Sequence, residues 1–291
     1  MKTLLFGANG QVGTELQRLW QGGELVSVPR SQCDLWDPEA LRRTIRQCAP
    51  AVILNAAAYT AVDRAETETE ACFASNAIAP GVMAEEAEKL GALLVHYSTD
   101  YVFDGEKNAP YTEADAVNPQ NQYGRSKVAG EQAIQATGTR YLIFRTSWVF
   151  SPSGTNFVKT MLRLAGERDR LRVVSDQVGA PTSAAAIARA TARVCRKDEI
   201  ATGLYHMTAE GSVAWSGLAE EIFRQAKFER APVVEPIGTA EYPTPAKRPK
   251  NSRLSNDKFA TTFGFRLPEW REELAETLAT LLPAPATKSA K

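Results

Sequence analysis

The sequence predicts an α/β protein built on a Rossmann-type doubly wound parallel sheet, with a smaller C-terminal lobe. Three observations predict this class. Short apolar runs alternate with longer amphipathic segments through the first half of the chain. The central runs are apolar throughout, as in strands that are buried on both faces. A glycine-rich turn follows the first run directly.

The elements of this first half follow a regular order along the chain. Each apolar run is expected to form a parallel strand, and each amphipathic segment a helix that crosses to the next strand. The expected strands are TLLF (3–6), ELVSV (24–28), AVIL (51–54), LLVHY (93–97) and YLIFR (141–145). The expected helices lie within 12–20, 38–48, 68–90 and 121–137.

The first strand leads into GANGQVG, which places Gly7, Gly10 and Gly13 between a strand and a helix. In this position glycines allow a tight turn, a close approach of backbone to ligand, and close packing of helix on strand. The helix then starts with free N–H groups and the positive end of its dipole, which favours a pyrophosphate. The loop therefore predicts dinucleotide binding, through these glycines together with Gln11 and Val12.

Beyond residue 150 the rhythm loosens and prolines divide the chain into shorter pieces. We expect residues 1–150 to form the dinucleotide-binding domain and residues 151–282 mainly the smaller lobe, with some later segments packing back on the first domain. Further helices are expected near 156–166, 183–196, 215–226 and 269–281. Residues 283–291 are small, polar or proline, and are expected to form a flexible tail.

The bulk composition excludes several classes of function. Lys plus Arg and Asp plus Glu are balanced at 34 each, so no general positive field exists to attract nucleic acid or an acidic membrane. The N-terminal apolar stretch is too short for a secretory signal, and we expect a cytoplasmic protein. The four cysteines have neither the spacing of a zinc site nor that of a disulfide framework, so we expect no metal.

A candidate acid lies in the expected helix 121–137, where Tyr123 precedes Lys127 by four residues. Reduction of a ketone produces an alkoxide that needs a proton, and a tyrosine can supply it. Residues four apart share one face of a helix, so the lysine charge is expected to lower the pKa of the tyrosine. The spacing alone is common, and the pair gains meaning from Ser98 and Thr99 at the end of the strand LLVHY.

The glycine spacing, the Ser/Thr strand end and Tyr-x-x-x-Lys together resemble the extended branch of the short-chain dehydrogenase/reductase superfamily. This resemblance implies that Tyr123 donates the proton, Lys127 also holds the nicotinamide ribose, and Thr99 orients the carbonyl. It further implies cofactor contacts from Tyr97, from Asp34 and Leu35 beside the adenine, and from the small residues Ala56, Ala57 and Ala58.

The end of the second strand indicates which cofactor binds. Arg30 stands where an acidic residue would hold the ribose 2′-hydroxyl, and an arginine there accommodates a 2′-phosphate. NADPH is therefore the expected cofactor, and NADH remains open.

Longer stretches narrow the resemblance to the bacterial dTDP-4-dehydrorhamnose reductases, from residue 1 to about 282. They are STDYVFDG, TSWVFSPSGTNFVKTML, SDQVGAPTS and RPKNSRLSNDKF. The resemblance implies a dTDP-linked 6-deoxy-4-ketohexose as substrate, contacted by Thr99, Asp100 and Trp148. Asn251 and Arg253 are expected either to reach the substrate diphosphate or to brace a turn.

The residue after Asp100 separates reduction from dehydration. Related 4,6-dehydratases carry an Asp-Glu pair after the threonine, whereas this chain has Asp100 followed by Tyr101. Reduction of the C4 ketone of dTDP-4-dehydro-L-rhamnose is therefore the expected activity. Two alternatives stay open: a non-catalytic regulatory subunit with this fold, and a reductase or epimerase of another nucleotide-linked ketosugar.

The resemblance also bears on assembly. Some of these reductases form a homodimer around a magnesium ion held by glutamates. Glu15 matches one such ligand, but Ala184 to Ala186 stand where another acid would be expected. A homodimer is thus an open expectation, without a predicted metal.

Overall fold

The computed structural model describes residues 1–282, and within them a six-stranded parallel sheet organises the larger lobe. The chain reverses its direction of growth between β1 and β3, the topological switch point at which such sheets bind ligands. The predicted doubly wound parallel sheet is confirmed. In spatial order the strands are β10 (Gly203–His206), β5 (Arg140–Thr146), β4 (Leu93–Thr99), β3 (Val52–Asn55), β1 (Thr3–Phe6) and β2 (Leu25–Val28).

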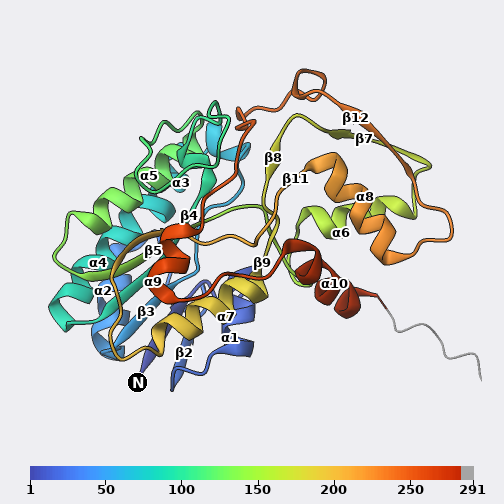
Figure 1. Cartoon of the computed structure of the whole chain (residues 1–291). Helices are drawn as coiled ribbons and strands as arrows, with labels where there is room; N and C mark the ends of the chain where they lie inside the picture. The colour runs from blue at the N-terminus through green and yellow to red at the C-terminus, as the bar shows by residue number, and fades with distance from the viewer. Residues whose placement is uncertain (283–291) are drawn as a thin grey trace, which may run out of the picture.

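Helices cover both faces of this sheet (Figure 1). One face carries α1 (Gln11–Leu19), α7 (Ala184–Cys195) and α9 (Asp257–Phe263). The other carries α2 (Pro38–Cys48), α3 (Thr69–Phe73), a π-helix (Ala74–Ile78), α4 (Ala79–Leu90) and α5 (Gln122–Gln135). Because the strands bury side chains on both faces, β1, β3 and β4 are apolar along most of their length.

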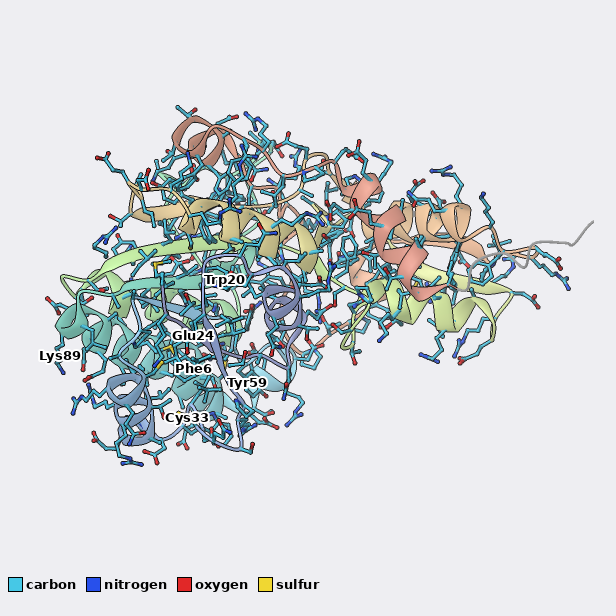
Figure 2. The ribbon with its side chains drawn as sticks, turned by 90° about the horizontal axis from the view of Figure 1, so that it is seen from below. Phe6, Trp20, Glu24, Cys33, Tyr59 and Lys89 are labelled. Atoms are coloured by element: carbon cyan, nitrogen blue, oxygen red, sulfur yellow. The ribbon has the colours of Figure 1, made fainter. Side chains whose placement is uncertain are left out.

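The smaller lobe has its own apolar core beside the sheet domain, and the two lobes lie side by side in both views (Figures 1 and 2). Its helices are α6 (Phe157–Ala165), α8 (Trp215–Ala226) and α10 (Trp270–Leu281). Its strands pair as β7 (Arg170–Val174) with β12 (Val233–Ile237), and β8 (Val178–Gly179) with β11 (Val213–Ala214).

The chain crosses between the lobes several times after residue 150. The short pair β6 (Val149–Phe150) and β9 (Thr182–Ser183) lies at the junction. Beyond it, α7, β10 and α9 return to the sheet domain: β10 extends the sheet beside β5, and Phe259 and Phe263 of α9 join its core. The expected tail, 283–291, lies outside the described residues.

Candidate active site

The glycine turn joins β1 to α1 at the switch point, against the loop after β3. Gly7 adopts φ +81°, and a Cβ there would lie 2.4 Å from the Ala57 nitrogen. A Cβ on Gly13 would lie 2.0 Å from the Gly7 carbonyl oxygen. Gly10 begins α1 without a side-chain cap, which leaves the helix N-terminus accessible to an anion. Only glycine fits at Gly7 and Gly13, and Gly10 leaves the N-terminus of α1 uncapped.

The next two residues of the turn face different neighbours. The Gln11 amide oxygen accepts hydrogen bonds from Asn156 Nδ2 (2.8 Å) and Ser151 Oγ (3.1 Å). Its side chain therefore ties α1 to the segment that enters α6. Val12 packs against the sheet core. Both side chains thus stabilise the turn, and their backbone lies at the uncapped helix end.

Arg30 and Asp34 lie together beyond the end of β2. The Arg30 guanidinium is 3.4 Å from Asp34 Oδ2 and 5.0 Å from the centroid of the Trp36 ring. The Arg30 side chain is 71% exposed, so this pair contributes little to stability. Leu35 packs against the core beneath. The arginine is accessible at the edge where the cofactor ribose was expected.

Ala56, Ala57 and Ala58 follow β3 at the carboxyl edge of the sheet, next to the glycine turn. The Ala56 N–H donates to the Phe6 carbonyl (3.0 Å), and the Ala57 N–H donates to Asn55 Oδ1 (3.2 Å). Ala58 is exposed. The small side chains leave this edge unobstructed.

Tyr123 lies in the first turn of α5, whose start is fixed by Asn121. The Asn121 amide oxygen accepts from the Gly124 N–H (2.8 Å) and caps the helix. The half-buried Tyr123 ring stands edge-on to Tyr101, with centroids 5.6 Å apart. Burial raises the pKa of the Tyr123 phenol, and the neighbouring Thr99 hydroxyl opposes part of the rise. The phenol is therefore held in its protonated form.

Lys127 lies one turn further along α5 and is 1% exposed. Its Nζ donates to the Tyr97 carbonyl (2.6 Å) and lies 3.2 Å from His96 Nε2. The expected lowering of the Tyr123 pKa by Lys127 is not observed, because burial of the phenol dominates and the lysine is directed at β4. Burial also lowers the pKa of Lys127 to about 8.

Thr99 ends β4 beside Tyr123, Asp100 follows it in a short 3-10 helix (Asp100–Val102), and both residues are buried. The Thr99 hydroxyl donates to Asp100 Oδ1 (2.9 Å) and accepts from the Tyr101 N–H (3.2 Å). Burial raises the pKa of Asp100 to about 6, against the opposing hydrogen bonds from Ser252 and Thr99. The Thr99 oxygen is thereby fixed at the carboxyl edge of the sheet.

Tyr97 differs from its neighbours in the direction of its side chain. Its hydroxyl bonds to Thr191 Oγ1 of α7 (2.9 Å) within the core, and the residue is 9% exposed. The contact that it makes with the catalytic candidates is through its carbonyl oxygen, which accepts from Lys127.

Trp148 lies at the junction of the two lobes with φ +47°, an uncommon conformation for a bulky residue. Its ring stacks on Trp215 of α8, with centroids 3.5 Å apart and 7° between planes. A Cβ on Gly179 would come within 2.5 Å of the Trp148 ring. Trp148 is thus held between α8 and β8, and it remains partly exposed.

Asn251 and Arg253 make hydrogen bonds that brace a turn, and a contact of either residue with the substrate diphosphate stays a prediction. Asn251 Nδ2 donates to the Lys107 and Ala109 carbonyls (2.6 and 2.9 Å). Arg253 donates to Asn251 Oδ1 (2.8 Å) and to the Asn108 carbonyl (2.7 Å).

Three buried polar residues near the site were not identified from the sequence. Asn55 and His96 lie behind Lys127. In the π-helix, Asn76 Oδ1 accepts from the Tyr59 N–H (2.8 Å), and Asn76 Nδ2 donates to Ser126 Oγ (3.0 Å). A histidine within the apolar run LLVHY was the available signal, since a buried polar group needs partners.

Metal ligands and thiols show no further site in the described chain. Residues 1–282 contain no group of three His, Cys, Asp or Glu side chains placed to hold a metal ion. Glu15 pairs with Arg18 at 2.7 Å, and the four cysteines are unpaired thiols. Among the same residues, no helix is long and apolar enough to traverse a bilayer.

Comparison with known proteins identifies the family. The family model described as RmlD substrate binding domain matches residues 1–282. The dTDP-4-dehydrorhamnose reductase of Burkholderia thailandensis is 46% identical, over 97% of this chain and 99% of its own length. This chain belongs to the dTDP-4-dehydrorhamnose reductase family.

Solved structures agree with this family assignment. A dTDP-4-dehydrorhamnose reductase from Clostridium acetobutylicum superposes with a TM-score of 0.92 at 41% identity, covering 97% of this chain and 99% of that one. The family member from Bacillus anthracis, solved in complex with NADP, has a TM-score of 0.90 at 34% identity and covers 96% and 99%.

Proposed function

We propose that this chain reduces the C4 ketone of dTDP-4-dehydro-L-rhamnose to the alcohol of dTDP-L-rhamnose, using NADPH or NADH. The observation that carries the proposal is the position of Thr99, Tyr123 and Lys127 around the end of β4: the Tyr123 phenol neighbours Thr99, and Lys127 Nζ donates to the Tyr97 carbonyl. Membership of the reductase family supports the same reaction. The absence of a glutamate after Asp100 favours reduction over dehydration.

The residues present fit a dinucleotide. Gly7 and Gly13 hold the turn close to the neighbouring backbone, and the uncapped start of α1 offers N–H groups to a pyrophosphate. The exposed Arg30, whose ion pair with Asp34 is weak, is accessible to a 2′-phosphate, which favours NADPH without excluding NADH. When bound, the dinucleotide supplies the hydride.

Tyr123 supplies the proton in this proposal. Its burial keeps the phenol protonated in the resting enzyme, so the hydroxyl is ready to donate as negative charge develops on the substrate oxygen. Thr99, fixed by its bond to Asp100, orients that oxygen. Lys127 would hold the ribose and, in its ammonium form, stabilise the phenolate that remains.

The sugar nucleotide would bind at the junction of the lobes. The partly exposed Trp148, just before β6, lies at this junction, and the family resemblance implies a further contact from Asp100, just after β4. An indole held by stacking on Trp215 offers a rigid surface for a sugar ring or a base at low entropic cost.

Oxidation of NADPH and of NADH, followed with dTDP-4-dehydro-L-rhamnose as acceptor, tests the activity. Tyr123→Phe should lower kcat by about 10²–10⁴-fold while the cofactor Kd stays nearly unchanged. Tyr141→Phe is the matched control, because Tyr141 lies at the amino end of β5, whereas the candidate site lies at the carboxyl edge of the sheet. Tight cofactor binding without turnover by the unmodified chain would instead favour a regulatory subunit.

Assembly and location are separate proposals within the same function. We infer a cytoplasmic enzyme, and a homodimer is the arrangement that the family resemblance implies. Light scattering of the purified chain measures the oligomeric state, and cell fractionation measures the location.

A further inference from the structure

Behind the catalytic lysine lies a buried polar chain that the proposed reaction does not use. Lys127 Nζ contacts two groups of β4, the Tyr97 carbonyl at 2.6 Å and His96 Nε2 at 3.2 Å. On its other side, His96 Nδ1 lies 3.0 Å from Asn55 Nδ2. Asn55 and Lys127 are each 1% exposed, and His96 is fully buried. Because bulk water does not reach these atoms, each proton has to be placed by its neighbours.

The backbone of the loop after β3 determines which group donates and which accepts in each of these hydrogen bonds. The Ala57 N–H points at Asn55 Oδ1 (3.2 Å), which identifies that atom as the amide oxygen. The amide nitrogen Nδ2 then faces His96 Nδ1 and donates to it. A neutral imidazole that accepts at Nδ1 carries its proton on Nε2. Burial lowers the pKa of His96 well below its usual value, and a charged Lys127 would lower it further, so the ring is neutral in either state of the lysine.

The Nε2–H of His96 then points at Lys127 Nζ. An ammonium group has no lone pair and cannot accept this hydrogen bond, whereas a neutral amine can. A neutral Lys127 would donate once, to the Tyr97 carbonyl, and accept once, from His96. Burial lowers the pKa of Lys127 to about 8, so the neutral amine becomes the main form above that pH.

We propose that Asn55 and His96 are positioning residues that set the protonation of Lys127 and couple it to the cofactor-facing loop Ala56–Ala58. This inference rests on the proposed function only for the role of Lys127 in catalysis. The hydrogen bonds run from the Ala57 N–H through Asn55 and His96 to Lys127.

Protonation of Lys127 reverses the donor and acceptor roles in this series of hydrogen bonds. The ammonium must donate to Nε2, the imidazole proton moves to Nδ1, and the Asn55 amide must rotate to present its oxygen. That rotation breaks the bond from the Ala57 N–H, which lies beside the glycine turn. A ligand contact that favours the loop without the Ala57–Asn55 hydrogen bond therefore also favours the charged Lys127. Charging of Lys127 favours that form of the loop by the same amount.

The other ionisable groups around Lys127 do not determine this direction. Glu131, one turn further along α5, raises the pKa of Lys127, but its carboxylate is bound by Arg145 at 2.6 Å. The Cys72 thiol has a pKa raised by burial, and the Tyr123 phenol likewise, so both groups are neutral. The direction of the hydrogen bond between His96 and Lys127 is thus the local feature that determines whether Lys127 is an amine or an ammonium.

Nitrogen-15 NMR of histidine-labelled, cofactor-free protein tests the proton positions without any activity measurement. The chain has two histidines, and His96→Gln assigns the spectrum by loss of one ring. We expect His96 to be neutral at pH 9, above the Lys127 pKa of about 8, with its proton on Nε2 and none on Nδ1. A proton on Nδ1, or a charged ring, would overturn the proposal.

Asn55→Asp tests the coupling. A carboxylate at this position accepts from Nδ1–H, which reverses the tautomer and turns Nε2 into an acceptor for the Lys127 ammonium. The Nδ1–H form should appear in the NMR spectrum. The high-pH limit of kcat, where Lys127 loses its proton, should move up by about one pH unit, a tenfold change in proton affinity.

Asn108→Asp is the matched control, because it adds the same charge at an exposed position. It should leave both the tautomer and the pH profile unchanged. An unchanged tautomer in Asn55→Asp would refute the role of Asn55. If that variant does not fold, the spectrum of the unmodified protein still decides the proposal. A chain with the expected tautomer but without turnover would refute the proposed reaction instead.

Discussion

The buried ion pair next to Lys127 gives the most demanding test of the site's energetics. Glu131 accepts from Arg145 Nε (2.9 Å) and Nη2 (2.6 Å), and both side chains are at most 5% exposed. Glu131→Gln keeps the shape of the side chain and removes its charge. The Arg145 guanidinium then stays buried without a counter-charge, since it cannot lose its proton.

Breaking a buried pair by removing one partner costs about 3–5 kcal/mol. For a chain of this size, that loss lowers Tm by roughly 5–8 °C. The same change removes the carboxylate that raises the pKa of Lys127. The pKa of Lys127 should therefore fall below about 8, and the high-pH limit of kcat should move down, opposite to the shift expected for Asn55→Asp.

Thermal unfolding and the pH profile of NADPH oxidation measure the two effects. Glu167→Gln is the matched control: Glu167 pairs with Arg163 at 2.8 Å, but both side chains are at least half exposed. Its loss should cost less than about 1 kcal/mol. If Glu131→Gln melts within 2 °C of the unmodified chain, the argument from an uncompensated buried charge is wrong.

Three further changes probe the cofactor and substrate regions. Gly13→Ala places a methyl group against the Gly7 carbonyl, which cannot yield, so NADPH binding followed by fluorescence should be lost; normal affinity would contradict the turn geometry. Arg30→Ser should raise the Kd of NADPH roughly tenfold and leave that of NADH unchanged, and equal effects on both would refute its role. Trp148→Ala removes the ring stacked on Trp215, and should raise the KM for the sugar nucleotide more than it lowers kcat in steady-state assays.

Much of the sheet domain could be predicted from the sequence because its signals are local. The apolar run YLIFR predicted a strand at 141–145, and β5 spans Arg140–Thr146. The helix expected at 121–137 is α5, Gln122–Gln135, which the Asn121 side chain caps. Strand, helix and glycine-turn patterns depend on neighbours within a few residues, so they can be read without knowledge of the fold.

The contacts around each catalytic candidate could not be predicted from local sequence patterns. The spacing of Tyr123 and Lys127 suggested a direct electrostatic effect of one on the other, whereas the lysine is directed at Tyr97 and His96 of β4. Trp148 stacks on Trp215, a partner 67 positions along the chain (215 minus 148). These contacts arise from strand order and lobe packing, which no local pattern encodes.

The sequence by itself determined the class of fold, the glycine turn and the set Thr99, Tyr123 and Lys127, because each is a choice of residue at a fixed spacing. Only the tertiary structure decided the charge environment of that set. Burial raises the pKa of Tyr123 and lowers that of Lys127, since α5 packs on β4 and removes the half-buried phenol and the fully buried amine, in part and in full, from bulk water. The proton on His96, which faces the lysine, follows from an asparagine on another strand and a backbone N–H beyond it.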